Sequence, residues 1–287
     1  MNGPEQLAKD RVVTRVPGGA ERDPVVFARR RRLLELGLGA GVPVALLVLW
    51  QVAASRGWIS RINYPTPSDI ASHALKIFKW EPGGNFGSDV WASAIRTIMG
   101  FCWGAGVGLL AGYSMGMNRT LRAALNPMLS ALYTVPKIAL IGVFLFIFGF
   151  DDKPVIAVIA VTVFFFVWIQ SMAAVMAVSE NYREAARSFG ASRWQMFRHV
   201  LLPATLTQVF VGLRVAAGVA VLTVIGVEFA FPPKTLGIGY RINNAKNIFD
   251  PKQAYVGLVV AALMGVAFSG IVSLIGRWLT PWARSRK

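Results

Sequence analysis

The sequence predicts an all-α membrane protein with about six transmembrane helices. Hydrophobic residues make up 55% of its 287 residues. The mean hydropathy of +0.52 is too high for a water-soluble domain. Long apolar runs alternate with short segments that contain charges, proline or glycine, which is the pattern of consecutive membrane spans. The class is therefore a polytopic membrane protein.

Composition excludes several kinds of site. Cys102 is the only cysteine, so the chain has no internal disulfide and no cysteine metal cluster. His73 and His199 are far apart in sequence, which argues against a metal site. The net charge of +16 could indicate nucleic-acid binding, but the cations cluster beside the apolar runs and no basic-aromatic module accompanies them. We predict no metal, no cofactor and no nucleic-acid partner.

The chain also lacks the motifs of an enzyme that uses ATP. No Gly-x-x-x-x-Gly-Lys-Ser/Thr phosphate loop occurs in it. No nucleophile, base and orienting group can be assembled from its residues either. If the protein moves a solute uphill, the energy must therefore come from another polypeptide.

The first part of the chain leads into a single span. Residues 1–28 mix proline, glycine and charges without periodicity, which predicts a disordered cytoplasmic tail. Residues 29–56 form the first predicted transmembrane helix. Residues 57–88 are a predicted outer loop that contains a short helix at 69–78, capped by Ser68.

The remaining spans form a predicted core at residues 89–281, followed by a cytoplasmic C-terminus at 282–287. The five spans are expected at 89–117, 126–150, 154–178, 204–231 and 254–279. Pro136 interrupts the second of these, because proline lacks the N–H that a helix needs. The outer loop at 232–252 either stays outside or dips back toward the membrane.

Glycines recur every four residues in the span at 89–117. The series is Gly100, Gly104, Gly108, Gly112 and Gly116. Small residues at this spacing allow helix backbones to approach closely in lipid, where packing drives association. This span is therefore predicted to lie at the centre of the bundle.

A charged insert at residues 179–203 separates two apolar runs. It holds four arginines, each of which would cost several kcal/mol in hydrocarbon, so it must lie outside the bilayer. Gly190 is placed to cap a first short helix, and Ser192 with Gln195 forms a capping box for a second. Pro203 marks where the second helix stops or kinks.

The second helix of the insert carries an apolar stripe formed by Trp194, Phe197 and Leu201. Arginines lie beside this stripe. A helix that exposes both kinds of side chain indicates a partner surface.

The insert has a specific family resemblance. Glu184-Ala185-Ala186, three residues, Gly190, nine residues and then a Val-Leu-Leu-Pro sequence ending at Pro203 resembles the EAA loop of membrane subunits of binding-protein-dependent ABC importers. From Tyr64 to its end the chain looks most like the nitrate, sulfonate and taurine permease branch.

This resemblance implies a type I ABC importer permease fold in the bacterial inner membrane, with both termini in the cytoplasm. The implied partners are two ABC ATPase subunits, an extracytoplasmic substrate-binding protein, a second copy of the chain and membrane lipid. Lys and Arg are more frequent in the segments assigned to the cytoplasm, as the positive-inside rule requires. The basic loop at 232–252 weakens that contrast.

The resemblance also assigns roles within the insert. Glu184 is expected to contact a basic residue of the ATPase, beside Ala185 and Ala186 on the docking helix. Gly190 would turn the chain, and Trp194, Phe197 and Pro203 would fix the second helix against the membrane domain. Alternatively, Glu184 is only a solvated helix residue.

Three residues within the apolar runs are candidates for the translocation pathway. Glu228 lies well inside an apolar run, where a carboxylate is expensive, and acts in a pathway or gate, links two helices by hydrogen bonds, or lies nearer the outer interface. Lys137 follows Pro136, and a cation beside broken helix backbone is one way to hold an anionic group. Snorkelling of Lys137 to an interface is the alternative.

Other residues indicate packing. Arg214 is assigned to packing or lipid headgroups near the inner end of its helix. Phe164, Phe165, Phe166 and Trp168 are assigned to core or lipid contacts in preference to a substrate cage.

The alternative functions are a secondary transporter or channel that works without an ATPase, and a membrane enzyme or receptor subunit. A secondary transporter is expected to have two halves of inverted topology and several ion ligands within the membrane, whereas this chain has one carboxylate inside an apolar run. The transported substrate stays open, since the branch includes importers of anions and also of pyrimidines, flavin and aromatic acids.

Overall fold

The computed structural model describes residues 24–79, 86–231 and 236–284, which form two units, residues 1–67 and 68–287. The first unit holds helix α2 (Pro24–Ser55). Its stretch Gly37–Ser55 is long and apolar enough to cross a membrane. The helix starts before the predicted boundary at residue 29, and residues 1–23 of the predicted tail lie outside the described residues.

The second unit is helical throughout its described part and contains no strand there. Its α-helices are α3 (Pro67–Lys79), α4 (Phe86–Met117), α5 (Arg119–Tyr133), α6 (Leu140–Phe148), α7 (Lys153–Met176), α8 (Glu180–Ser188), α9 (Arg193–Gln195), α10 (Leu202–Ala230), α11 (Ile238–Asn247) and α12 (Pro251–Leu279). The described chain has five helices that could cross a membrane, or six if α5 and α6 count as one broken span. The predicted all-α class is confirmed.

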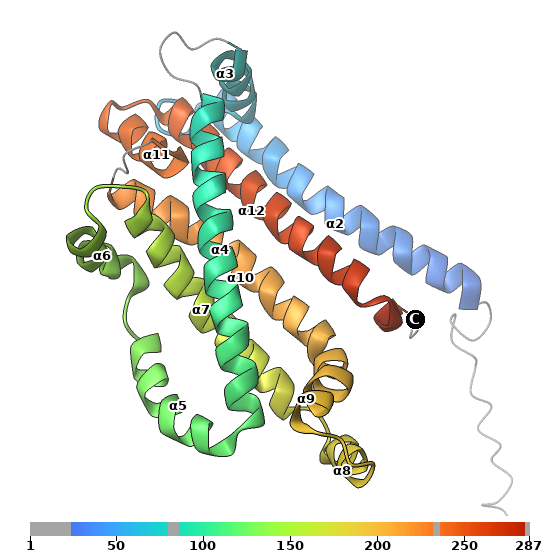
Figure 1. Cartoon of the computed structure of the whole chain (residues 1–287). Helices are drawn as coiled ribbons and strands as arrows, with labels where there is room; N and C mark the ends of the chain where they lie inside the picture. Colours follow the sequence, from blue (N-terminus) through green and yellow to red (C-terminus); the bar gives the residue numbers. More distant parts are fainter. Residues whose placement is uncertain (1–23, 80–85, 232–235, 285–287) are drawn as a thin grey trace, which may run out of the picture. The chain divides into compact units, whose positions relative to one another are not determined.

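Helices α4, α7 and α10 form the centre of this unit (Figure 1). The buried apolar core is built mainly from these three helices, with Ile141 of α6 and Val272 of α12 at its edges. Most of α12 exposes apolar side chains. Only 6% of its most apolar 18-residue stretch is buried in the described chain. An apolar surface of this kind is suited to lipid or to another protein.

The glycine series of α4 is the contact surface for α7. An ideal Cβ at Gly104 would lie 2.3 Å from the backbone oxygen of Ala160. At Gly108 it would lie 2.9 Å from the oxygen of Phe164, and Gly100, Gly112 and Gly116 are equally crowded by residues of α7. Gly106, outside the series, has nothing within 4 Å. The predicted central position of this span is confirmed.

The second core span was predicted at 126–150, and the structure shows a break within it. Helices α5 and α6 meet at an angle of 81°, joined by a short 3-10 turn at Lys137–Ala139 with Pro136 at its start. Helix α5 begins at Arg119, where the side chain of Asn118 accepts hydrogen bonds from two backbone N–H groups. The cap at Asn118, which the sequence analysis did not use, explains the earlier start.

The second helix of the charged insert is longer than predicted. Helix α9 passes through a π-helical segment, Met196–Leu201, into α10. The prediction of a separate short helix was wrong. Pro203 lies in the first turn of α10, where a missing N–H is tolerated, and the wide π turn comes just before it.

Two other helices begin at residues different from those predicted. Helix α3 starts at Pro67, so Ser68 lies inside the helix instead of capping it. Helix α12 starts at Pro251, because the side chain of Asp250 accepts a hydrogen bond from the backbone N–H of Gln253. Between α10 and α12 the described part of loop 232–252 is mainly helix α11; residues 232–235 lie outside the described chain.

The glycine contact gives a direct stability test. We expect Gly104→Ala to destabilise the protein by about 1–3 kcal/mol, because backbone atoms of α7 cannot move aside for the new methyl group. Gly106→Ala is the matched control and should be neutral or slightly stabilising, since its site is open. Unfolding in detergent micelles measures both. Equal stability of the two variants would contradict the packing described here.

Candidate functional site

The charged insert forms a compact corner at the end of α7. Helix α8 ends at Ser188, and Gly190, two residues further on, has a φ of +74°. The N–H of Gly190 donates to the carbonyl of Arg187, and the N–H of Ala191 donates to the carbonyl of Ala186. This pair of bonds is a Schellman motif, and it requires the left-handed backbone that glycine adopts without strain. The predicted role of Gly190 as the turn residue agrees with this geometry.

The corner continues into α10 through the predicted capping box. The side chain of Ser192 accepts from the N–H of Gln195, and the side chain of Gln195 accepts from the N–H of Ser192. Phe197 then packs edge-on against Tyr113 of α4, with ring centroids 5.4 Å apart. The hydroxyl of Tyr113 is 2.7 Å from that of Thr205 on α10. These contacts hold the insert against the bundle.

The other predicted packing residues of the insert are more exposed. Trp194 is 64% exposed, although its ring lies 5.4 Å from that of Phe197. Pro203 is exposed in the first turn of α10. Leu201 of the predicted stripe is buried. Anchoring in the described chain therefore comes from Phe197 and Leu201.

Helix α8 is charged and largely exposed. Glu180 lies 3.2 Å from Arg187 and 3.8 Å from Arg183. Arg183 also donates to the carbonyl of Val175 near the end of α7. Glu184 is exposed one helical turn after Glu180, and Phe189 at the tip is 91% exposed. The side chain of Glu184 is therefore accessible to a partner protein.

The second candidate residue, Glu228, lies near the C-terminal end of α10, whereas the insert precedes the N-terminal end of that helix. Its carboxylate is completely buried. Arg96 of α4 forms an ion pair with it, and the hydroxyl of Ser93 lies 2.7 and 3.0 Å from its two oxygens. The N–H of Gly239 in α11 donates to it at 3.1 Å. Glu228 therefore links α4, α10 and α11.

The same cluster extends beyond Glu228. Arg96 also pairs with Asp152 at the start of α7, at 2.9 Å. The hydroxyl of Ser93 accepts from the N–H of Ile238, and Arg241 of α11 pairs with Asp89 of α4. This set of partners was not predicted from the sequence. Arg96, a cation inside an apolar helix, was the signal that a carboxylate in another span would be its partner.

These contacts support one of the readings of Glu228. Hydrogen bonds from α4 and α11 to this residue of α10 fit the reading as a link between helices. Removing both ions of a pair from water costs free energy. The pair is therefore stable only while the hydrogen-bond partners of both ions stay in place.

Lys137 lies at the break between α5 and α6, as predicted. Its ammonium group donates to the carbonyl of Tyr133 and lies 4.5 Å from the centroid of the Tyr133 ring and 5.0 Å from that of Phe165. Pro136 is exposed beside it. Lys137 is therefore held at the C-terminal end of α5, where a cation is stabilised by the helix dipole.

The remaining singled-out residues are packing or surface residues. Phe165 and Trp168 are buried, with Phe164 and Phe166 partly buried against the core, so the reading as core residues fits. Arg214 is exposed beside a groove between the ends of α10 and α12. Among the described residues no group of three or more His, Cys, Asp or Glu could hold a metal ion.

A helical bundle of membrane spans with a protruding charged insert defines a membrane component of a transport system. The chain belongs to the family described as binding-protein-dependent transport system inner membrane component, which matches residues 104–285. It is accordingly a permease subunit of an ABC importer and not an enzyme, and ATP is hydrolysed by a separate subunit. The predicted family is confirmed.

Several relatives fall in the predicted branch. The putative aliphatic sulfonates transport permease SsuC of Bacillus subtilis is 30% identical over 247 residues, covering 86% of this chain and 88% of the relative. The taurine permease TauC of Escherichia coli is 27% identical over 252 residues (86% and 90%). The nitrate permease NrtB of Synechococcus elongatus is 27% identical over 248 residues (83% and 88%).

The fold has solved counterparts. A chain of the inward-facing MetNI methionine ABC transporter aligns with a TM-score of 0.59 and 19% identity, covering 67% of this chain and 95% of that one. A chain from the crystal structure of an amino acid ABC transporter with histidines aligns with a TM-score of 0.53 and 18% identity (67% and 92%). The predicted type I importer permease fold is confirmed.

The buried cluster predicts a large stability effect. We expect Glu228→Ala to lower the free energy of unfolding by roughly 3–5 kcal/mol, because Arg96 keeps a buried charge with its buried partner removed. Glu184→Ala is the control: this exposed carboxylate should change stability by about 0.5 kcal/mol or less. Thermal and denaturant unfolding of the purified chain measures both. A Glu228→Ala protein as stable as wild type would show that the cluster is not structural.

Proposed function

We propose that α8 is the element through which the ATPase moves this permease, and that Glu184 makes the charged contact with the ATPase. The exposed face of α8, held on a short and rigid corner, is the observation that carries the proposal. Ala185 and Ala186 keep the helix narrow beside Glu184, and Gly190 sets its direction. Trp194, Phe197 and Pro203 lie at the base, where Phe197 transmits movement to α4.

We further propose that two copies of the chain form the pathway and that lipid covers the rest of the apolar surface. One chain carries one insert, and a pair of ATPase subunits needs two. The exposed apolar side chains of α12 and α6 supply surface for a second copy and for lipid.

The orientation places both termini and the insert in the cytoplasm. Lys and Arg concentrate in the segments on that side, in agreement with the positive-inside rule. The cluster around Glu228 and helix α11 then lies toward the outer side, where the binding protein would deliver substrate.

The pathway residues act in different ways in this proposal. Glu228 holds α11 at the outer end of the pathway and does not touch the solute, because no part of its carboxylate is exposed. Lys137 and Pro136 lie at the break between α5 and α6, where open helix backbone and a partly exposed cation can line the route of an anion.

The proposed substrate is a small solute with an anionic group, of the sulfonate, taurine or nitrate type. The support is the agreement among the relatives, whose names refer to aliphatic sulfonates, taurine and nitrate. Thermal melting of the cognate binding protein with taurine, an alkanesulfonate or nitrate measures this directly. A melting shift with a solute that has no anionic group, and with none of these three, would contradict it.

The coupling role predicts a specific loss of activity. We expect Glu184→Lys, and separately Gly190→Pro, to abolish ATP hydrolysis stimulated by the binding protein in the assembled transporter without loss of expression. The first variant reverses the docking charge, and the second cannot adopt the φ of +74° at the corner.

Lys252→Glu is the matched control for the charge reversal. Lys252 is exposed at the start of α12, on the proposed outer side, so its reversal should leave stimulated hydrolysis unchanged. Transport that continues in the complete absence of an ATPase would favour the secondary transporter or channel instead.

The orientation has its own measurement. In a chain whose single cysteine, Cys102, is replaced by serine, we expect Phe189→Cys to react with an impermeant maleimide only from the cytoplasmic face. Phe150→Cys, 86% exposed in the proposed outer turn, should react only from the outer face. The reverse pattern would overturn the proposed orientation.

A further inference from the structure

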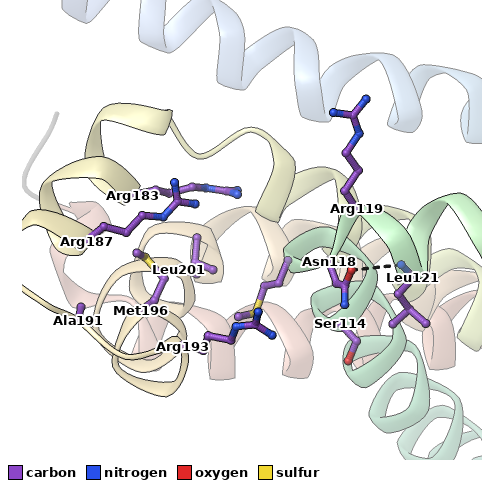
Figure 2. Close-up of a pocket in the computed structure, with 11 residues that line it drawn as sticks. Ser114, Asn118, Arg119, Leu121, Arg183, Arg187, Ala191, Arg193, Met196 and Leu201 are labelled. Carbon is purple, nitrogen blue, oxygen red and sulfur yellow. Dashed lines mark hydrogen bonds between the residues drawn. The ribbon is translucent and has the colours of Figure 1, made fainter.

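A cavity of about 630 Å³ lies between helix α8 and the junction of α4 with α5. Four arginines line it: Arg119 at the start of α5, Arg183 and Arg187 on α8, and Arg193 at the start of α9. Figure 2 shows Arg183 and Arg187 reaching from α8, with Arg193 and Arg119 contributed by the other elements. None of the residues that line this cavity is acidic.

The charges of the cavity are only partly compensated. Glu180 lies close to Arg183 and Arg187, so one carboxylate faces two guanidinium groups. Arg119 and Arg193 form no ion pair with any residue of the described chain. In addition, the buried Nε of Arg183 lacks a hydrogen-bond partner among the described residues. Cations gathered in this way repel one another unless an anion lies among them.

A neighbouring cavity of about 470 Å³ continues the same surface. Arg119 and Arg183 line both cavities, and the second also includes Arg122 and Glu180. The floor of the first cavity contains the apolar side chains of Met196 and Leu201. A cationic rim above an apolar floor, at the point where membrane spans end, suits a ligand with an anionic group and an apolar or ester-linked body.

We propose that this arginine cavity binds a phosphate group, carried either by an anionic phospholipid of the inner leaflet or by a soluble phosphate compound. Guanidinium groups bind phosphate through paired, charge-assisted hydrogen bonds, and its several oxygens can accept from more than one arginine. The cavity volume is within the range of small-molecule sites.

The bound phosphate group connects the coupling corner, which is formed by α8 and the turn into α9, to the helix bundle. Arg183 and Arg187 belong to α8, whereas Arg193 belongs to α9, so a phosphate held by arginines of both elements would bridge them. Glu184 does not line the cavity, so the residue proposed to contact the ATPase lies outside the phosphate site. The site is distinct from the proposed coupling contact and from the pathway for the transported solute.

The test uses the full chain purified alone in zwitterionic detergent, so it does not depend on the ATPase or on the transported substrate. The ligands are dioctanoyl phosphatidylglycerol, inorganic phosphate and, as the zwitterionic comparison, dioctanoyl phosphatidylcholine. Thermal unfolding gives the shift at each concentration, and native mass spectrometry counts bound phosphatidylglycerol.

The variant Arg119→Gln with Arg193→Gln removes two cavity arginines that hold no structural ion pair, so the protein should fold. The control, Arg198→Gln with Lys252→Gln, removes the same charge from exposed residues that line neither cavity. We expect a saturable rise in the melting temperature with wild type and control, and an affinity weaker by on the order of tenfold or more in the cavity variant.

The ligands separate the two sources of phosphate. A shift with phosphatidylglycerol alone assigns the site to a lipid headgroup, and a shift with inorganic phosphate as well assigns it to a soluble compound. The proposal is overturned if neither ligand raises the melting temperature, if phosphatidylcholine acts as strongly as phosphatidylglycerol, or if the control loses as much affinity as the cavity variant.

Discussion

The close backbone contact between α4 and α7 is the constraint on which the rest of the second unit depends. Lipid offers no hydrophobic driving force for helix association, so the contact must come from packing, and side chains larger than hydrogen at the glycine series would separate the helices. Helices α4 and α7 are fixed to each other along their length. Helix α10 packs into the same core and connects the two polar ends of the unit. The coupling corner lies at one end and the Glu228 cluster at the other (Figure 1).

The two ends use charge differently because their surroundings differ. In the Glu228 cluster, Arg96 and Glu228 are fully buried and are stabilised by partners from α4, α10 and α11 and by Asp152 at the start of α7, so the cluster fixes where α11 lies. At the coupling corner the charges are mostly exposed, and an exposed ion pair contributes little to stability. Backbone geometry holds the corner instead, through the Schellman motif, the capping box and the bond from Arg183 to Val175.

The sequence predicted the features that follow from local rules. The glycine spacing, the turn at Gly190 and the capping box with Ser192 each depend on residues within a few positions of one another, and each agrees with the structure. Contacts between distant residues were not accessible in this way: Ser93 and Glu228 are separated by 135 positions. The break after Tyr133 was expected from Pro136, but the 81° bend depends on how α6 packs against α7.

The geometry of the corner around α8 supports the proposal that a short insert moves the whole bundle. A flexible loop would absorb a displacement, whereas here α8 is tied to the end of α7 by Arg183 and continues through α9 and the π-helical segment into α10. Phe197 adds a contact with α4. In the proposed coupling, a force on α8 reaches all three central helices through these contacts. An anion among the arginines of the cavity would stiffen the corner further, which would connect the inner surface with the element proposed to receive the ATPase.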